Sequence, residues 1–99
     1  MTVYQWDEAN IAHIAEHDVL SHEAEEAYDS DPLFLEYCVE DGEERYREIG
    51  ETRAGRILVV VSTMRGEWVR IVTAYEDRRL KLIYLAFKES EQHGKEDHS

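Results

Sequence analysis

Several features that would mark a secreted or membrane-spanning protein are missing from this sequence of 99 residues. It has one cysteine, Cys38, so no disulfide can form within the chain, and a lone thiol in an apolar run is usually a small buried hydrophobe. No stretch approaches the roughly 18 apolar residues of a membrane-spanning helix. The acidic N-terminus also lacks the basic and apolar regions of a signal peptide. These absences predict a cytoplasmic protein.

Basic side chains are absent before Arg45, in a part of the chain where acidic ones are frequent. The balance reverses between Arg45 and Lys88, where Lys and Arg outnumber Asp and Glu, although the whole chain has a formal net charge of -12. A basic segment can bind a polyanion such as RNA, whereas an acidic segment repels it. The acidic part either keeps a small protein soluble or forms a docking surface for a basic partner.

The first third of the chain reads as a short strand-like opening followed by two helices. Residues 3–6 favour a strand, and Asp7 can cap a helix that runs over about residues 8–17. Ser21 is a suitable N-cap for a second helix, SHEAEEAY. Pro32 ends this helix because proline cannot continue it and disfavours helical geometry at the preceding residue.

Four strands and a closing helix follow. Alternating patterns and strand-forming residues predict strands, separated by short turns, at residues 33–39, 45–50, 57–63 and 68–75. A helix beginning near residue 76 places four large apolar side chains on one side. We expect these side chains to pack on the sheet: Leu80, Ile83, Tyr84 and Phe87.

The predicted fold class is α+β. Turns this short connect neighbouring strands, so we expect two short N-terminal helices, a four-stranded and mostly antiparallel meander sheet, and a C-terminal helix packed on the sheet. Residues 1–89 form a single domain in this prediction. Residues 90–99 contain no aliphatic or aromatic side chain that could anchor them, and we expect them to form a disordered, acidic and polar tail.

The segment HIAEH at residues 13–17 matches the H-x-x-E-H pattern of one class of zinc peptidase. His13 and His17 are four residues apart on one helical face and can suit two ligands of a zinc ion, with Glu16 beside them as a base. A peptidase also needs a third ligand, for which His22 is the nearest candidate. The residues alone fit a catalytic metal site, weak adventitious metal binding, or a histidine pattern unrelated to metal. His17 by itself can also be a residue that ends its helix near the C-terminal dipole.

Several short segments, none of them specific alone, keep an order and spacing that resemble one known family. They are WDE at 6–8, HIAEHDV at 13–19, HEAEEA at 22–27, DPL at 31–33, the pair Arg45 and Tyr46, Gly50, GRILVVVST at 55–63, RIVTA at 70–74, the pair Arg78 and Arg79, and Tyr84. Together they make the chain similar to the BrnT family of bacterial toxin ribonucleases, over residues 6–84.

This resemblance implies a fold similar to the RelE-type ribonucleases, with RNA cleaved without a metal or cofactor. It also implies inhibition by a ribbon-helix-helix antitoxin, and it places His17, Arg45 and Arg70 in the catalytic site. The three side chains suit the chemistry, because attack by the ribose 2′-OH needs a proton acceptor and donor, which His can be near neutral pH. Arginine can neutralise the phosphate through paired hydrogen bonds.

Further RNA contacts are expected outside the catalytic set. Guanidinium groups can bind phosphates and an aromatic ring can stack on a base, although both also occur as ordinary solvated or packed surface. The expected RNA-binding residues are Arg47, Tyr46, Arg78 and Arg79. The sequence leaves open whether the chain also forms a homodimer.

Two residues depart from the pattern of the family. Glu16 stands where a lysine usually precedes the histidine, and Tyr75 stands where an arginine usually follows the alanine of the last strand. Both changes remove a positive charge close to the expected phosphate site, and a nearby carboxylate weakens phosphate binding. They favour a second hypothesis, in which a catalytically degenerate relative uses its acidic surface to bind a protein.

Overall fold

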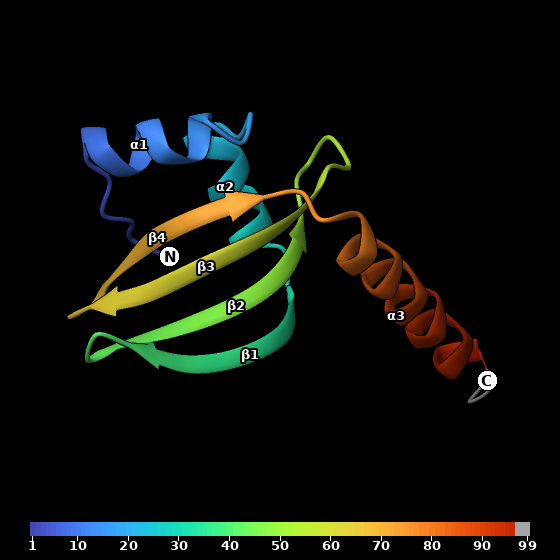
Figure 1. The fold of residues 1–99 in the computed structure, drawn as a ribbon. Helices are drawn as coiled ribbons and strands as arrows, with labels where there is room; N and C mark the ends of the chain where they lie inside the picture. The colour runs from blue at the N-terminus through green and yellow to red at the C-terminus, as the bar shows by residue number, and fades with distance from the viewer. Residues whose placement is uncertain (97–99) are drawn as a thin grey trace.

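The structure is a computed structural model that describes the backbone of residues 1–96 and the side chains of residues 1–92. Two helices, four strands and a third helix follow one another along the chain (Figure 1). They are α1 (Glu8–Ala15), α2 (Ser21–Tyr28), β1 (Leu33–Glu40), β2 (Glu43–Glu51), β3 (Ile57–Arg65), β4 (Trp68–Tyr75) and α3 (Arg78–Glu96). The strands pair in the order β1-β2-β3-β4, each antiparallel to its neighbour, so the predicted α+β meander is confirmed.

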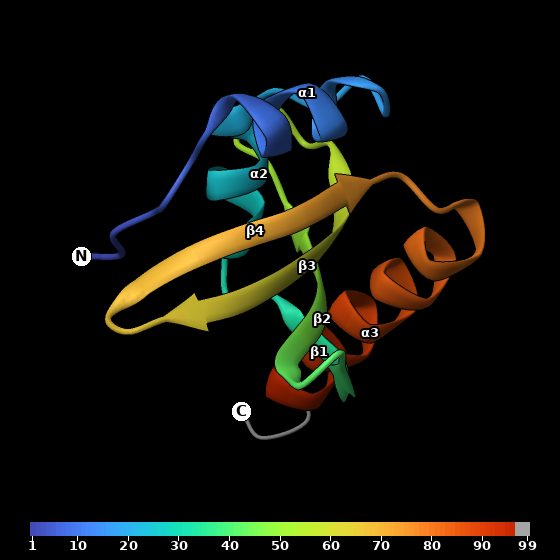
Figure 2. The ribbon, with the colours of Figure 1, turned by 60° about the vertical axis from the view of Figure 1, so that its left-hand side comes forward.

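Helices α1 and α2 cover one face of the sheet, whereas α3 lies on the other (Figure 2). Alternation along β3 divides its side chains between the two faces, so that Leu58 and Val60 meet α1 and α2 while Ile57 and Val59 meet α3. This explains why residues 57–60 are apolar without interruption. None of the helices in residues 1–96 is both long and apolar enough to cross a membrane.

Helix α1 is fixed at its start by reciprocal hydrogen bonds. The Asn10 N–H donates to the Asp7 carboxylate at 2.9 Å, and the Asp7 N–H donates to the Asn10 side-chain oxygen at 2.8 Å. The Asn10 amide nitrogen also donates to the Ile71 carbonyl at 3.0 Å, which ties α1 to β4. The helix ends at Ala15, two residues before the expected end at His17, and Asp18 follows in the left-handed region with φ 58°.

Helix α2 begins one residue earlier than its sequence indicated. Ser21 is its first helical residue, so the prediction of Ser21 as N-cap is wrong and Leu20 occupies that position. A leucine side chain cannot accept a hydrogen bond, and the free N–H of Leu20 instead donates to the Glu23 carboxylate at 3.0 Å. The C-terminal turn of α2 lies against β2 at Gly50, where no side chain separates the two backbones.

The N-terminal segment contributes a single pairing to the sheet. Tyr4 forms a parallel bridge with Val69, and the Gln5 N–H donates to the Val69 carbonyl at 2.8 Å. The strand-like opening predicted at residues 3–6 is therefore reduced to one bridge at the edge of β4. Its main effect is to place Asp7 and the start of α1 beside that strand.

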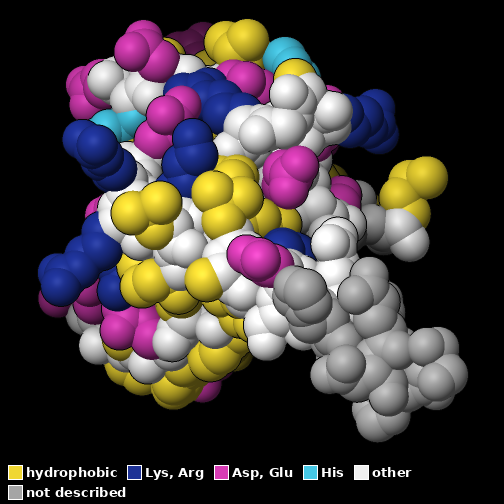
Figure 3. Space-filling view, turned by 90° about the vertical axis from the view of Figure 1, so that its right-hand side faces the viewer, with side chains coloured by type: hydrophobic (Ala, Val, Ile, Leu, Met, Phe, Trp, Pro, Cys, Tyr) yellow, Lys and Arg dark blue, Asp and Glu magenta, His cyan; other side chains and the backbone are white. Residues whose placement is uncertain are grey.

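Helix α3 packs on the sheet through fewer residues than predicted. Leu80 and Tyr84 contact the core formed with Ile49 and Val59. Ile83 and Phe87 are 49% and 38% exposed, so the prediction that they pack on the sheet is wrong. The helix leaves the sheet edge at an angle, and hydrophobic side chains are visible among charged ones on this side of the molecule (Figures 1 and 3).

The described helix continues beyond the expected end of the domain. α3 includes residues 90–96, which were expected to belong to the disordered tail. Residues 97–99 lie outside the described part of the chain. The division into a domain of residues 1–89 and a disordered tail therefore stays a prediction.

Helices α1 and α2 leave part of their sheet face uncovered, over β1, β2 and β3. We call this area the aromatic patch and define it by the six residues that line a hollow of about 280 Å³: Tyr28, Phe34, Tyr46, Glu48, Ser62 and Met64. Within the described chain, no hydrogen bond or ion pair joins the Glu48 carboxylate to another residue. Burial raises the pKa of this carboxyl group.

Replacing Glu48 with glutamine is expected to raise the free energy of unfolding at neutral pH, by less than about 1 kcal/mol for a half-buried group. The raised pKa means that the folded chain binds this proton more tightly than the unfolded chain, so stability is lost as the pH rises through the folded pKa. Urea unfolding at neutral pH and at about pH 4 measures the effect, which should shrink at the lower pH because both states are then increasingly protonated. The exposed Glu67→Gln is the control, and a pH-independent difference at Glu48 would contradict the explanation.

Candidate functional site

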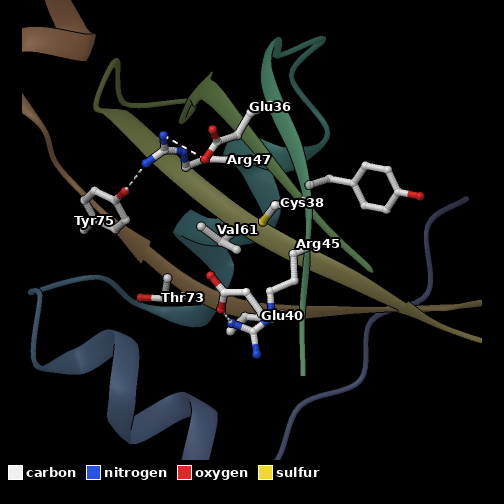
Figure 4. A pocket seen from close by; sticks show the side chains of 10 residues that line it. Glu36, Cys38, Glu40, Arg45, Arg47, Val61, Thr73 and Tyr75 are labelled. Carbon is white, nitrogen blue, oxygen red and sulfur yellow. Dashed lines mark hydrogen bonds and ion pairs between the residues drawn. The ribbon is translucent and has the colours of Figure 1, made fainter. Parts of the chain in front are cut away.

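A cavity of about 220 Å³ opens on the α3 face of the sheet, beyond the part that α3 covers. One row of paired residues crosses all four strands beneath it: Glu36 on β1 is opposite Arg47 on β2, which is opposite Val61 on β3, which is opposite Thr73 on β4. We call this cavity the sheet pocket (Figure 4). It is lined by Glu36, Cys38, Glu40, Arg45, Tyr46, Arg47, Val61, Val72, Thr73 and Tyr75.

A β-bulge lies on each side of the sheet pocket. In β1 the pairing register skips Leu35, so that Leu35 stays in the apolar core and Glu36 turns toward Arg47. In β4 the register skips Val72, so that Thr73 faces the pocket while Ile71 points into the core beneath α1. Bulges redirect side chains and are frequent beside active sites.

Carboxylates from β1 and β2 hold both guanidinium groups of the sheet pocket. Arg45 contacts Glu40 at 2.7 Å and Glu43 at 3.3 Å, and Arg47 contacts Glu36 at 2.9 Å. The contacts with Glu40 and Glu36, both on β1, are drawn as dashed lines in Figure 4. All of these side chains are partly exposed to solvent, so each pair is weak enough for a competing anion to replace the carboxylate.

Two buried polar atoms in the sheet pocket have no hydrogen-bond partner within the described chain. They are the Nε of Arg47 and the hydroxyl oxygen of Thr73. Arg47 also donates from Nη1 to the Tyr75 hydroxyl at a long 3.5 Å. This hydrogen bond and the nearby Glu36 raise the pKa of Arg47 against the opposing effect of burial, so the guanidinium stays charged. Buried polar groups are normally satisfied, and two orphaned atoms in one cavity are explained if a ligand binds there.

Of the three residues expected to form the catalytic site, Arg45 and Arg70 lie on the same face of the sheet, the pocket face. Arg45 lines the sheet pocket. The His17 ring lies at its border, with its centroid 6.0 Å from that of Tyr75. Arg70 pairs instead with the Asp7 carboxylate at 3.1 Å, at the start of α1. The hydrogen bond from the Asn10 N–H, followed by the contact with Arg70, lowers the pKa of Asp7.

Arg56 holds the turn after His17 close to the end of β4. Its guanidinium donates to the Asp18 carbonyl at 2.6 Å and pairs with Glu23 on α2 and with Glu76, the residue after Tyr75. These contacts link the turn after α1, the start of α2 and the segment that leads to α3. They explain how an exposed histidine is kept beside Tyr75.

The residues predicted to bind RNA occupy different positions around the sheet pocket. Arg47 lines it, opposite Val61 on β3. Tyr46 alternates with Arg45 and Arg47 along β2 and is part of the aromatic patch, where its ring lies 5.4 Å from that of Tyr37. Arg78 and Arg79 are exposed at the first turn of α3, directly after the segment that follows β4.

Thr73 and Glu36 line the sheet pocket but were not identified from the sequence. Thr73 and Tyr75 alternate along the last strand as Arg45 and Arg47 do along the second, and this shared polar alternation was an available signal. This signal could not be used without the pairing register, which places β2 and β4 on either side of β3. The sequence marks Tyr75 as a missing positive charge and as an aromatic ring that could stack on a base.

The zinc-peptidase interpretation of HIAEH finds no third ligand in the described part of the chain. No group of three His, Cys, Asp or Glu side chains there is arranged to hold a metal ion. The His13 and His17 rings pack edge to face with centroids 5.6 Å apart, and the Glu16 carboxylate lies 3.9 Å from Nδ1 of His13. The histidine pair thus forms an exposed surface cluster.

Comparison with known proteins gives one match, which is to a family model. No curated protein matches the chain. A family model described as "Ribonuclease toxin, BrnT, of type II toxin-antitoxin system" matches residues 6–79, which include α1, α2, all four strands and every residue of the sheet pocket. The chain therefore belongs to the BrnT family of ribonuclease toxins of type II toxin-antitoxin systems.

Proposed function

We propose that this chain is an endoribonuclease that binds an RNA phosphodiester in the sheet pocket, between Arg45 and Arg47. The observation that carries the proposal is the pair of orphaned buried atoms, Arg47 Nε and Thr73 Oγ1, in the same cavity as two guanidinium groups. A phosphate oxygen that displaces Glu36 can accept from the Arg47 guanidinium, and Arg47 Nε and the Thr73 hydroxyl become further donors once the side chains that bury them move. Paired donation from a guanidinium suits the tetrahedral phosphate.

Cleavage in this proposal uses the RNA's own nucleophile. The ribose 2′-oxygen attacks the adjacent phosphorus, the bond to the 5′-oxygen of the next nucleotide breaks, and the products are a 2′,3′-cyclic phosphate and a 5′-hydroxyl. One proton leaves the 2′-OH and one joins the 5′-oxygen, and His17 at the border of the pocket acts as the acid or base. Arg45 and Arg47 stabilise the charge that develops on the non-bridging oxygens.

The remaining cationic residues have a supporting role in the proposal. Arg70, outside the sheet pocket on β4, binds a flanking phosphate once it exchanges Asp7 for RNA, and Arg78 and Arg79 extend the path beyond the other end of β4. No metal or cofactor takes part. The protein acts in the cytoplasm, and its antitoxin is of the ribbon-helix-helix class; a homodimer remains a further prediction.

Purified chain incubated with single-stranded RNA tests the proposal. We expect cleavage in the presence of EDTA, products that end in cyclic phosphate, and no cleavage of the same oligonucleotide when its riboses are replaced by deoxyriboses. His17→Ala should lower the rate by about 100-fold or more, within the usual contribution of a general acid or base. The matched control is His22→Ala, another exposed histidine, which lies on α2 outside the sheet pocket and should cleave at the wild-type rate.

A noncatalytic function is the alternative, and the ion pairs favour it. Glu36, Glu40 and Glu43 already occupy the guanidinium groups that should bind phosphate. If the wild-type chain binds its antitoxin but neither cleaves RNA nor arrests growth when expressed in bacteria, the nuclease proposal is wrong. The chain would then be an acidic BrnT-like scaffold that binds a protein.

A further inference from the structure

The aromatic patch is an exposed apolar surface on the face of the sheet opposite the sheet pocket. Phe34 and Met64 are 54% and 48% exposed, and Tyr37 beside them on β1 is 48% exposed. β1 is an edge strand, so no further strand of the described chain borders the patch on that side. Large apolar side chains gathered at one exposed site mark a surface that binds another molecule.

RNA and protein are the two classes of macromolecule that could bind this surface, and the charge of the patch distinguishes between them. Glu44 and Glu48 alternate with Tyr46 along β2 and therefore face the patch side, and no Lys or Arg is among its six lining residues. Aromatic rings can stack on RNA bases, but two carboxylates repel the phosphates that accompany them. A polypeptide with apolar side chains around one Lys or Arg suits both the exposed aromatic rings and the negative charge of the patch, because its cation can pair with Glu48.

We propose that the aromatic patch is the docking surface for the antitoxin and that the docked segment places a Lys or Arg against Glu48 within an apolar contact. The proposal rests on family membership for the existence of an antitoxin, but not on the chemistry of the sheet pocket. The patch and the pocket share β1, β2 and β3, and they lie on opposite faces of these strands. A segment seated on the patch can thus continue around the free edge of β1 to reach Glu36 and Glu40.

An unpaired, half-buried carboxylate is otherwise hard to explain in so small a domain. It costs stability in the free chain, because burial disfavours its charged form. A cation from a partner removes this cost when the complex forms, and excludes partners that lack one. Glu48 in this view selects the partner, while Phe34 and Met64 provide most of the apolar contact.

The probe for the test is the antitoxin encoded by the reading frame next to that of the toxin, with its affinity measured by titration calorimetry. Glu48→Lys and Phe34→Asp should each weaken binding by about 30-fold or more, as central interface residues do. The matched controls carry the same changes elsewhere: Glu67→Lys in the β3–β4 turn, and Leu82→Asp on α3, where Leu82 is 63% exposed. Both should bind within about threefold of the wild-type chain.

A charge exchange makes the test specific. One Lys→Glu or Arg→Glu variant of the antitoxin should restore binding to Glu48→Lys while weakening binding to the wild-type toxin. Circular dichroism and thermal melting check that each variant folds, and Met64→Glu replaces any patch variant that does not. The proposal is overturned if the patch variants bind as tightly as wild type, if Leu82→Asp weakens binding instead, or if no antitoxin variant restores binding.

Two further results would also overturn the proposal. One is a wild-type chain that does not bind the antitoxin. The other is a loss of RNA affinity in Phe34→Asp together with a gain in Glu48→Lys, which would identify the patch as an RNA surface. Affinity for the antitoxin is measured without RNA, so a failure of the nuclease proposal leaves this measurement unaffected.

Discussion

Replacing Arg47 with alanine is expected to lower kcat/KM for RNA cleavage by about 100- to 1000-fold, the usual cost of removing one preorganised donor to a developing anion. Arg47 occupies the centre of the residue row across the sheet, opposite Val61 and Glu36, and its Nε is buried in the sheet pocket without a partner. Alanine at this position removes the charge and every donor together. The measurement is single-turnover cleavage of a short RNA at constant salt.

Two variants separate the effects of charge and geometry at the same position. Arg47→Lys keeps the positive charge but has no Nε and no planar pair of donors, so it should recover only a small part of the rate. Glu36→Gln removes the carboxylate that lies 2.9 Å from Arg47, and it should increase RNA affinity because phosphate no longer has to displace an ion pair.

Arg65→Ala is the matched control for these variants. Arg65 is also a strand arginine paired with a glutamate, Glu43 at 2.9 Å, but it does not line the sheet pocket. Its replacement should change cleavage by no more than about threefold, because surface pairs of this kind contribute little. An Arg47→Ala chain that is folded and cleaves RNA at nearly the wild-type rate would remove the sheet pocket from the mechanism.

Local patterns were sufficient to predict the fold. Alternation in β2 and β4, the apolar run of β3 and the short turns between them predict an antiparallel meander, and Asp7 and Pro32 bound the helical region as expected. The wrong predictions concern residues whose burial depends on tertiary packing rather than on the local sequence pattern. Ile83 and Phe87 follow the correct helical period, but they are 49% and 38% exposed and do not belong to the core that α3 forms with the sheet.

The candidate site was harder to predict because it depends on pairing register. Strict alternation from Thr73 would place Ile71 on the pocket face and Arg70 in the core. The bulge at Val72 reverses this arrangement, so that Ile71 is fully buried and Arg70 lies on the pocket face, opposite Thr63, where it pairs with Asp7. A bulge inserts one residue without an obvious sequence signal, and it changes the face of every residue beyond it.

Gly50 lets the backbone of strand β2 approach helix α2 closely, and a single methyl group there should have a large effect on stability. A Cβ at Gly50 would lie 2.0 Å from the Ala27 carbonyl oxygen and 2.9 Å from the Ser30 hydroxyl. Two hydrogen bonds keep the helix end in place: the Ser30 hydroxyl donates to the Ala27 carbonyl at 2.7 Å and accepts from the Glu51 N–H at 3.0 Å.

Gly50→Ala is therefore expected to reduce the free energy of unfolding by about 3 kcal/mol or more, since relief of the clash requires α2 to move away from a packed core. Such a loss is a large part of the roughly 5–15 kcal/mol that stabilises a small domain, and urea unfolding followed by circular dichroism measures it. Gly42→Ala is the matched control: Gly42 has φ 78°, and a methyl group there would meet no atom within 4 Å. It should cost only the roughly 1–2 kcal/mol of left-handed backbone strain. Equal losses at the two glycines would mean that α2 tolerates displacement from β2, and that the Ala27 contact does not determine how the helix pair is placed on the sheet.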